Sequence, residues 1–120
     1  MIITIKEQNY NLKLSIKGVI NLEQKMGTNP VNVLMNMAQN TTTMPEISQL
    51  ALIMHEAFQP FNHGISLDDT YNLLGDWFEE GHSITDLVQV VVELFTASGL
   101  IPKEEEIKEE TGKNVKKTSK

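Results

Sequence analysis

The residues best suited to metal chemistry in this chain are its three histidines. His55 stands next to Glu56, whereas His63 and His82 occur later in the sequence. A metal site would need two of these imidazoles to converge with a carboxylate. No pair has the His-x-x-x-His or His-Glu-x-x-His spacing that places two ligands on one face of a helix. We therefore interpret the histidines as surface or hydrogen-bonded side chains and predict no metal site.

A second candidate for chemistry is a group of carboxylates around one expected helix, namely Asp68, Asp69, Asp76, Glu79 and Glu80. Paired carboxylates carry out acid–base catalysis when one of them is desolvated. Asp68 and Asp69, however, fall in the first turn of that helix, where the helix dipole favours negative charge. Glu79 and Glu80 are typical of a solvated helix end. We interpret the whole group as structural.

Other catalytic chemistry lacks the residues that it needs. The 120 residues include no cysteine, which excludes disulfides, thiolate catalysis and cysteine zinc sites. The sequence has no Gly-x-Ser-x-Gly turn and no glycine-rich phosphate loop, and its seven glycines are scattered. We predict a protein that is not an enzyme and that has no catalytic residue and no cofactor.

The charge distribution narrows the range of partners. The formal net charge is −6, and residues 1–100 carry four Lys against eleven Asp and Glu. There is no Arg, the residue best suited to phosphate and base-edge recognition, so we predict no nucleic-acid partner. The start of the chain does not resemble a leader peptide. No apolar run reaches the roughly 20 residues that a membrane helix needs. We therefore expect a cytoplasmic protein without a membrane partner.

A β-hairpin is predicted at the start of the chain. Apolar and polar residues alternate over residues 2–6 and 10–14, as in half-buried strands. Residues 7–9 are predicted to connect them, with Asn9 in the left-handed conformation that tight turns often need. Because a two-stranded hairpin is at best marginally stable alone, it must pack on the following helices or on another molecule.

Five helices are predicted after the hairpin from apolar residues at helical spacing, over residues 16–26, 31–38, 47–58, 67–78 and 84–95. Gly27 and Gly99 stand where helix C-caps usually lie, and Asn29-Pro30 is a start signal. Three capping boxes are predicted to start the last three helices: Thr43 with Glu46, Ser66 with Asp69, and Ser83 with Asp86. In the first of these five helices, the stripe that includes Ile16 and Ile20 is expected to be buried.

The last of these helices has an unusually wide apolar surface. Val90 and Val92 extend its stripe until it is apolar nearly all round, as in a helix that is central in a core or covered by another subunit. The valine run also favours a strand over residues 88–94. The stripe continues over three turns and agrees with the capping signals, so we predict a helix.

The predicted fold class is mainly α, with an N-terminal two-stranded β-hairpin followed by about five helices. We place these elements in one domain over residues 1–100. Residues 101–120 carry six Lys and five Glu with little apolar content, and we predict a charged, disordered tail there.

Two kinds of residue could form a partner surface. Five methionines, Met26, Met35, Met37, Met44 and Met54, lie in or near the first three helices, where they either pack in the core or form a groove for a partner helix. Phe61, in a loop over residues 60–65, is either an exposed anchor or packs under the loop. The predicted partner or self-association contacts are Ile3, Ile5, Met26, Met35, Met37, Phe61, Val90 and Val92.

The order of these elements carries a family resemblance. Residues 2–34, IITIKEQNYNLKLSIKGVINLEQKMGTNPVNVL, resemble the opening of tail assembly chaperones from long, non-contractile-tailed bacteriophages and prophages. In that family a short hairpin runs into a helix that carries Leu-Glu and ends near Gly, and a second short helix follows. The matching positions are Leu22-Glu23, Gly27 and Asn29-Pro30. Residues 77–81 and 87–95 are similar in character to the later helices of the family, and the resemblance covers about residues 1–100.

The resemblance implies a non-enzymatic role in viral tail assembly. Such a chaperone binds the tape measure protein and keeps it soluble during tail tube assembly, in the cytoplasm of the bacterial host, and is absent from the mature virion. It also implies a homo-oligomer and a longer, frameshifted form that recruits the tail tube protein. The alternative is a small acidic helical adaptor or inhibitor that binds a host or phage protein.

Overall fold

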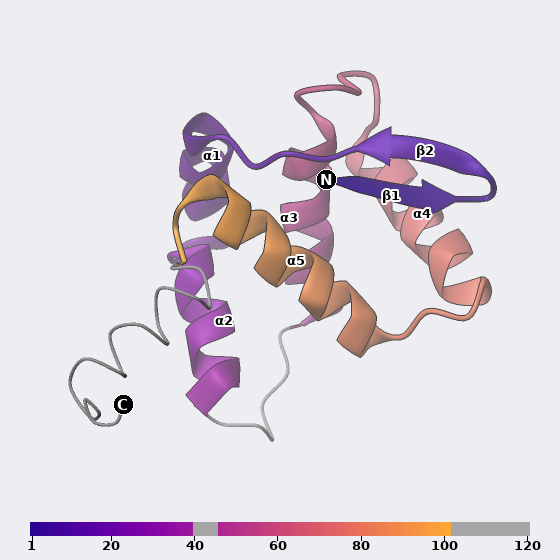
Figure 1. The fold of residues 1–120 in the computed structure, drawn as a ribbon. Coiled ribbons are helices and arrows are strands. Elements are labelled where there is room, and N and C mark those ends of the chain that lie inside the picture. Colours follow the sequence, from indigo (N-terminus) through magenta and orange to yellow (C-terminus); the bar gives the residue numbers. More distant parts are fainter. Residues whose placement is uncertain (40–45, 102–120) are drawn as a thin grey trace, which may run out of the picture.

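The computed structural model describes residues 1–39 and 46–101 (Figure 1). The elements are β1 (Ile2–Ile5), β2 (Gln8–Asn11), α1 (Ile16–Met26), α2 (Pro30–Gln39), α3 (Ile47–Phe58), α4 (Leu67–Glu79) and α5 (Ile84–Ser98). The predicted fold class, an antiparallel N-terminal hairpin followed by five helices, is confirmed for the described part. From residue 102 onward, the predicted charged tail lies outside the described residues.

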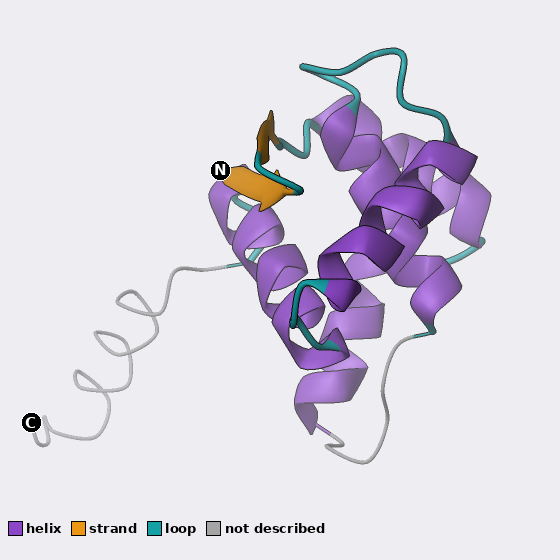
Figure 2. Cartoon of the chain, turned by 90° about the vertical axis from the view of Figure 1, so that its right-hand side faces the viewer, coloured by secondary structure: helices purple, strands orange, loops and turns teal. Residues whose placement is uncertain are grey.

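Helix α3 is the central element of the fold. It packs against α1, α4 and α5, while β1 packs against α4 (Figure 1). Figure 2 shows the two strands on one side of the helices rather than between them. A single core cluster includes Ile5 and Leu12 of the hairpin region, Leu22 of α1, Phe58 of α3 and Phe95 of α5. The hairpin is therefore stabilised by the chain's own helices.

The hairpin turn is tighter than predicted. Lys6 and Glu7 form a two-residue turn with φ of 50° and 68°, and the strands pair Ile5 with Gln8. Turns with two left-handed residues match the twist of the flanking strands, although Asn and Gly are the residues that favour these positions. The predicted connection over residues 7–9 is wrong, because Asn9 lies within β2 opposite Thr4.

The apolar alternation predicted over residues 10–14 continues beyond the end of β2. The Leu12 N–H donates to the Met1 carbonyl at 2.8 Å, and the Lys13 N–H donates to the Ala57 carbonyl at 3.0 Å. The side chains of Leu12 and Leu14 are both buried. Residues 12–15 thus follow β2 in the chain and precede α1. Leu12 is hydrogen-bonded to Met1, next to β1, and Lys13 is hydrogen-bonded to Ala57, near the end of α3.

Most helix ends agree with the predicted signals. Gly27 and Gly99 adopt left-handed conformations at the ends of α1 and α5, with φ of 72° and 89°. The boxes of Ser66 with Asp69 and of Ser83 with Asp86 are confirmed by reciprocal hydrogen bonds. The Asn29 Oδ1 accepts the Val31 N–H at 2.9 Å at the start of α2.

The predicted cap of α3 is wrong by three residues. Thr43 lies outside the described residues, and Glu46 occupies the N-cap position immediately before Ile47. The Glu46 N–H donates to the Gln49 Oε1 at 3.3 Å. Glu46 and Gln49 thus form the capping pair, three residues apart, that we expected from Thr43 and Glu46.

The fifth helix is confirmed, and the alternative strand over residues 88–94 is therefore wrong. Val91, Leu94 and Phe95 are buried, whereas Val90 and Val92 are half-buried against the same core.

Within the described residues, none of the helices is both long enough and apolar enough to cross a membrane.

Candidate functional site

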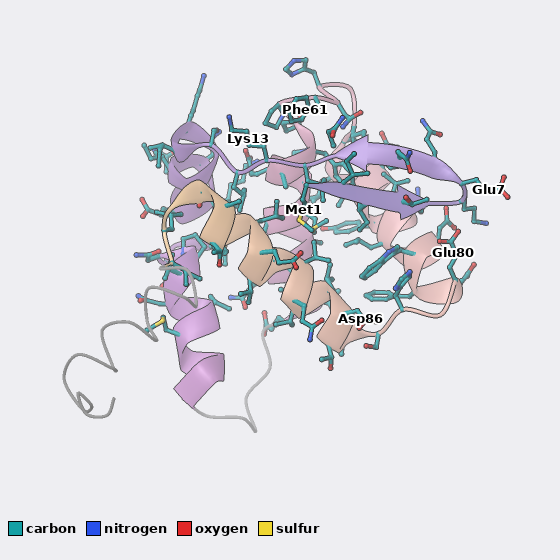
Figure 3. The ribbon with its side chains drawn as sticks, in the orientation of Figure 1. Met1, Glu7, Lys13, Phe61, Glu80 and Asp86 are labelled. Carbon is teal, nitrogen blue, oxygen red and sulfur yellow. The ribbon has the colours of Figure 1, made fainter. Side chains whose placement is uncertain are left out.

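An apolar hollow of about 270 Å³ lies where the end of the hairpin meets the C-terminal half of α5. Its apolar lining comes from Met1, Leu12, Leu14, Phe61, Leu94 and Ala97. Lys13 also lines it, and Figure 3 shows Met1, Lys13 and Phe61 around the segment that leaves β2 toward α1. Three separate parts of the chain therefore contribute to this hollow.

Hydrogen bonds hold the two chain segments that carry the exposed apolar side chains of the hollow. The amino group of Met1 donates to the Leu12 carbonyl at 3.1 Å and so extends the hairpin ladder to the first residue. The Asn62 N–H donates to the Phe58 carbonyl at 2.8 Å, and the Asn62 Nδ2 donates to the Asn11 carbonyl at 3.4 Å. These contacts fix the loop that carries Phe61 against the hairpin.

The hollow is suited to a side chain of another protein. Phe61 and Met1 are 56% and 43% exposed, so both side chains offer apolar surface beside the hollow. The volume of the hollow is below the range of about 300–1,000 Å³ typical of small-molecule sites. A partner that inserts an apolar side chain would also cover Phe61 and Met1. Burial of apolar area on both sides would then favour the complex.

The structure places the predicted contact residues in different environments. Ile3 and Ile5 are only 6% and 1% exposed, because they occupy the inner face of the hairpin. Neither side chain is open to a partner in the folded chain, so we retain neither as a surface contact. Phe61 is exposed at the hollow, so it does not pack under its loop as the alternative supposed.

The remaining predicted contacts are spread over the molecule. Met26, Val90 and Val92 are half-buried against the core, and Met35 of α2 is 47% exposed. The side chain of Met37 lies outside the described part, as does Met44. Met54 is fully buried in α3, which confirms core packing for that methionine. The structure thus does not gather the methionines into one described groove.

Helix α1 exposes part of the stripe that we expected to be buried. Ile16 and Ile20 are 59% and 47% exposed, whereas Val19 and Leu22 belong to the core. Ile16 and Ile20 are four residues apart and therefore lie on the same outward face of the helix. The prediction that this stripe is buried is wrong for these two residues, because α1 packs on α3 with a narrower face than its sequence offers.

The histidines lie at different places. His82 stacks on Trp77 with ring centroids 4.1 Å apart, and its Nδ1 is 3.8 Å from the Asp86 carboxylate. His55 and His63 line a second cavity, between α1 and the end of α3. In the described part of the chain, no group of three His, Asp or Glu residues is arranged to hold a metal ion.

Three carboxylates in or next to α4 have partners within the fold. Asp69 accepts the Ser66 N–H at 3.0 Å in the capping box. Asp76 lies 3.7 Å from the Lys6 ammonium, and Glu80 accepts the Lys6 N–H at 2.7 Å. Asp69 thus caps the helix as predicted, whereas Glu80, which we predicted to be solvated, accepts a hydrogen bond from the hairpin turn.

Comparison with protein families covers nearly the whole chain. Residues 2–119 match a family of unknown function, DUF6096. The chain belongs to DUF6096. No curated protein and no solved structure matches it. Every residue that lines the apolar hollow, apart from Met1, falls within the part of the chain matched to DUF6096.

From the sequence, Phe61 was predicted as a possible partner contact, whereas the other residues that line the apolar hollow were not. A single methionine such as Met1 carries no sequence pattern of its own. Leu94 looked like an ordinary part of a helical stripe, and Ala97 lies beyond the helix predicted over residues 84–95. The sequence signal was the position of aromatic Phe61 in a predicted loop, since loop aromatics often contact partners.

Proposed function

We propose that this DUF6096 protein is a tail assembly chaperone of long, non-contractile-tailed bacteriophages or prophages. It binds the tape measure protein and keeps that protein soluble while the tail tube assembles. The observation that carries the proposal is the apolar hollow, with Phe61 and Met1 exposed beside it. The resemblance of residues 2–34 to this class of chaperone supplies the identity of the client.

The hollow supports binding to a helical client. An amphipathic client helix presents apolar side chains three and four residues apart. One of these side chains enters the hollow, and its neighbours cover Phe61 and Met1. Full burial of one such side chain contributes about 1.5–3 kcal/mol, so a single site binds weakly. Several copies on one long client give high avidity without a large site on each copy.

The proposed role also defines the assembly state of the protein, its location and a second partner. The protein acts as a homo-oligomer in the cytoplasm of the bacterial host and is absent from the mature virion. A longer form, produced by ribosomal frameshifting, recruits the tail tube protein. No catalytic step is involved, and the protein works by covering apolar surface of its client.

Co-expression with the tape measure gene of the same phage or prophage tests the function. We expect the tape measure protein to become soluble and to co-purify with this chain. The proposal fails if the tape measure protein stays insoluble and does not co-purify. A discrete one-to-one complex with a host protein would instead support the adaptor alternative.

A further inference from the structure

A second cavity, of about 520 Å³, lies between the first turns of α1 and the last turn of α3. It is lined by polar and charged side chains, among them Lys13, Lys17, His55, Glu56 and His63. Lys13 also lines the apolar hollow. The two cavities therefore meet at Lys13, in the segment of residues 12–15.

Two of the four lysines in residues 1–100 are neutralised within the fold. Lys6 lies 3.7 Å from the Asp76 carboxylate. The Lys25 ammonium donates to the Glu56 Oε2 at 2.9 Å, where the Glu56 side chain is only 7% exposed. The negative charge of Glu56 in the second cavity is therefore balanced by Lys25.

The other two lysines have no such partner. In the part of the chain that the structure describes, Lys13 and Lys17 have no carboxylate within ion-pair distance, and both are exposed. Both line the second cavity. Residues 46–100 carry nine Asp and Glu and no Lys or Arg. This cavity is thus the place where the described surface presents unbalanced positive charge on an otherwise acidic body.

His55, which also lines the second cavity, has one ring nitrogen without a hydrogen-bond partner among the described residues. Its Nδ1 atom is buried and has no hydrogen-bond partner among the described residues. Buried polar atoms are nearly always paired, so an unpaired one at a cavity needs an explanation. Because this atom has almost no exposed surface, a bound segment does not reach it directly, and the charge preference of the cavity rests on Lys13 and Lys17.

We propose that the two cavities together bind an acidic amphipathic helix, whose apolar side chain enters the hollow and whose carboxylates face Lys13 and Lys17. The inference rests on the proposed function only for the identity of the client, a tape measure segment. The charge of the segment follows from the unbalanced lysines, because complementary charge steers partners and rejects wrong ones. Basic segments are disfavoured at this place and attracted to the acidic remainder of the surface.

Two labelled synthetic helical peptides test the charge preference by fluorescence anisotropy. Both carry the same leucine face, and the opposite face carries Glu in one and Lys in the other. We expect the Glu peptide to bind about tenfold more tightly at low salt, and the difference to shrink as salt screens the exposed charges. Equal affinity for the two peptides would overturn the proposal.

Charge-matched variants connect the preference to the cavity. The double variant Lys13→Gln, Lys17→Gln should lose the preference for the Glu peptide. The control Gln24→Glu, Gln89→Glu changes the net charge by the same amount at exposed helical positions outside the cavity lining and should keep most of it. Circular dichroism checks that both variants fold. A preference that survives in the lysine double variant contradicts the proposal.

Two further results separate this inference from the proposed function. If the lysine double variant still co-purifies the tape measure protein as well as the wild type does, the function stands and the inference fails. If the tape measure protein never co-purifies but the Glu peptide binds through Lys13 and Lys17, the inference stands and the function fails. Lysine-dependent binding of a single-stranded oligonucleotide in place of the Glu peptide would overturn the assignment to a polypeptide.

Discussion

The backbone N–H of Lys6 donates a hydrogen bond of 2.7 Å to the Glu80 carboxylate, 74 residues later in the chain. Figure 3 shows Glu80 next to the hairpin turn, at the end of α4. A turn of Lys6 and Glu7 has two left-handed residues without Gly, a strained conformation for most side chains. The bond to Glu80 helps to hold this turn in place and attaches the hairpin to the helices.

Replacement of Glu80 should loosen the hairpin. We expect Glu80→Ala to lower the free energy of unfolding by about 1 kcal/mol, since the lost bond is charge-assisted but exposed. Urea denaturation measures the change. Glu79→Ala is the matched control, because Glu79 is also exposed and makes no such bond in the described part. Equal losses for the two variants would show that Glu80 does not hold the turn.

The ion pair between α1 and α3 should be sensitive to the loss of one partner. Lys25→Met leaves the nearly buried Glu56 carboxylate without its cation, and we expect a loss of about 2 kcal/mol. Lys17→Met is the control, since Lys17 has no carboxylate partner among the described residues. Thermal or urea unfolding compares the two. A loss for Lys25→Met no larger than for Lys17→Met would contradict the pairing.

The inner face of the hairpin should behave as core. Ile5 is 1% exposed, and we expect Ile5→Ala to lower the free energy of unfolding by about 2–4 kcal/mol. Ile2, which is 58% exposed on the outer face, should tolerate Ala within about 0.5 kcal/mol. Urea unfolding of the isolated protein distinguishes them. Similar small effects at both positions would return Ile5 to the set of possible partner contacts.

The helices were predictable because their signals are local. Ser66, Ser83, Gly27 and Gly99 each specify a helix end through neighbouring residues in the chain. The period of the apolar residues likewise depends only on the residues within each helix. For α5, these two local signals outweighed the strand preference of its valines.

The hairpin turn and the proposed binding surface were not predictable in this way. The turn depends on Lys6 meeting Glu80, a contact that no local pattern reveals. The apolar hollow combines Met1, Phe61 and Leu94, which come together only after the hairpin docks on the helices. Similarly, the exposure of Ile16 depends on how much of α1 the neighbouring helix covers, and not on the stripe itself.

Binding of the client through the hollow is tested most directly by a matched pair of substitutions. Phe61→Ser removes the exposed aromatic ring at the hollow, while Tyr71→Ser removes one that is 46% exposed on α4 and does not line the hollow. Each variant is co-expressed with the tape measure protein, and the soluble, co-purified tape measure protein is measured. We predict that Phe61→Ser loses most of it and that Tyr71→Ser keeps it. Wild-type yields with a correctly folded Phe61→Ser protein would contradict a chaperone role for this hollow.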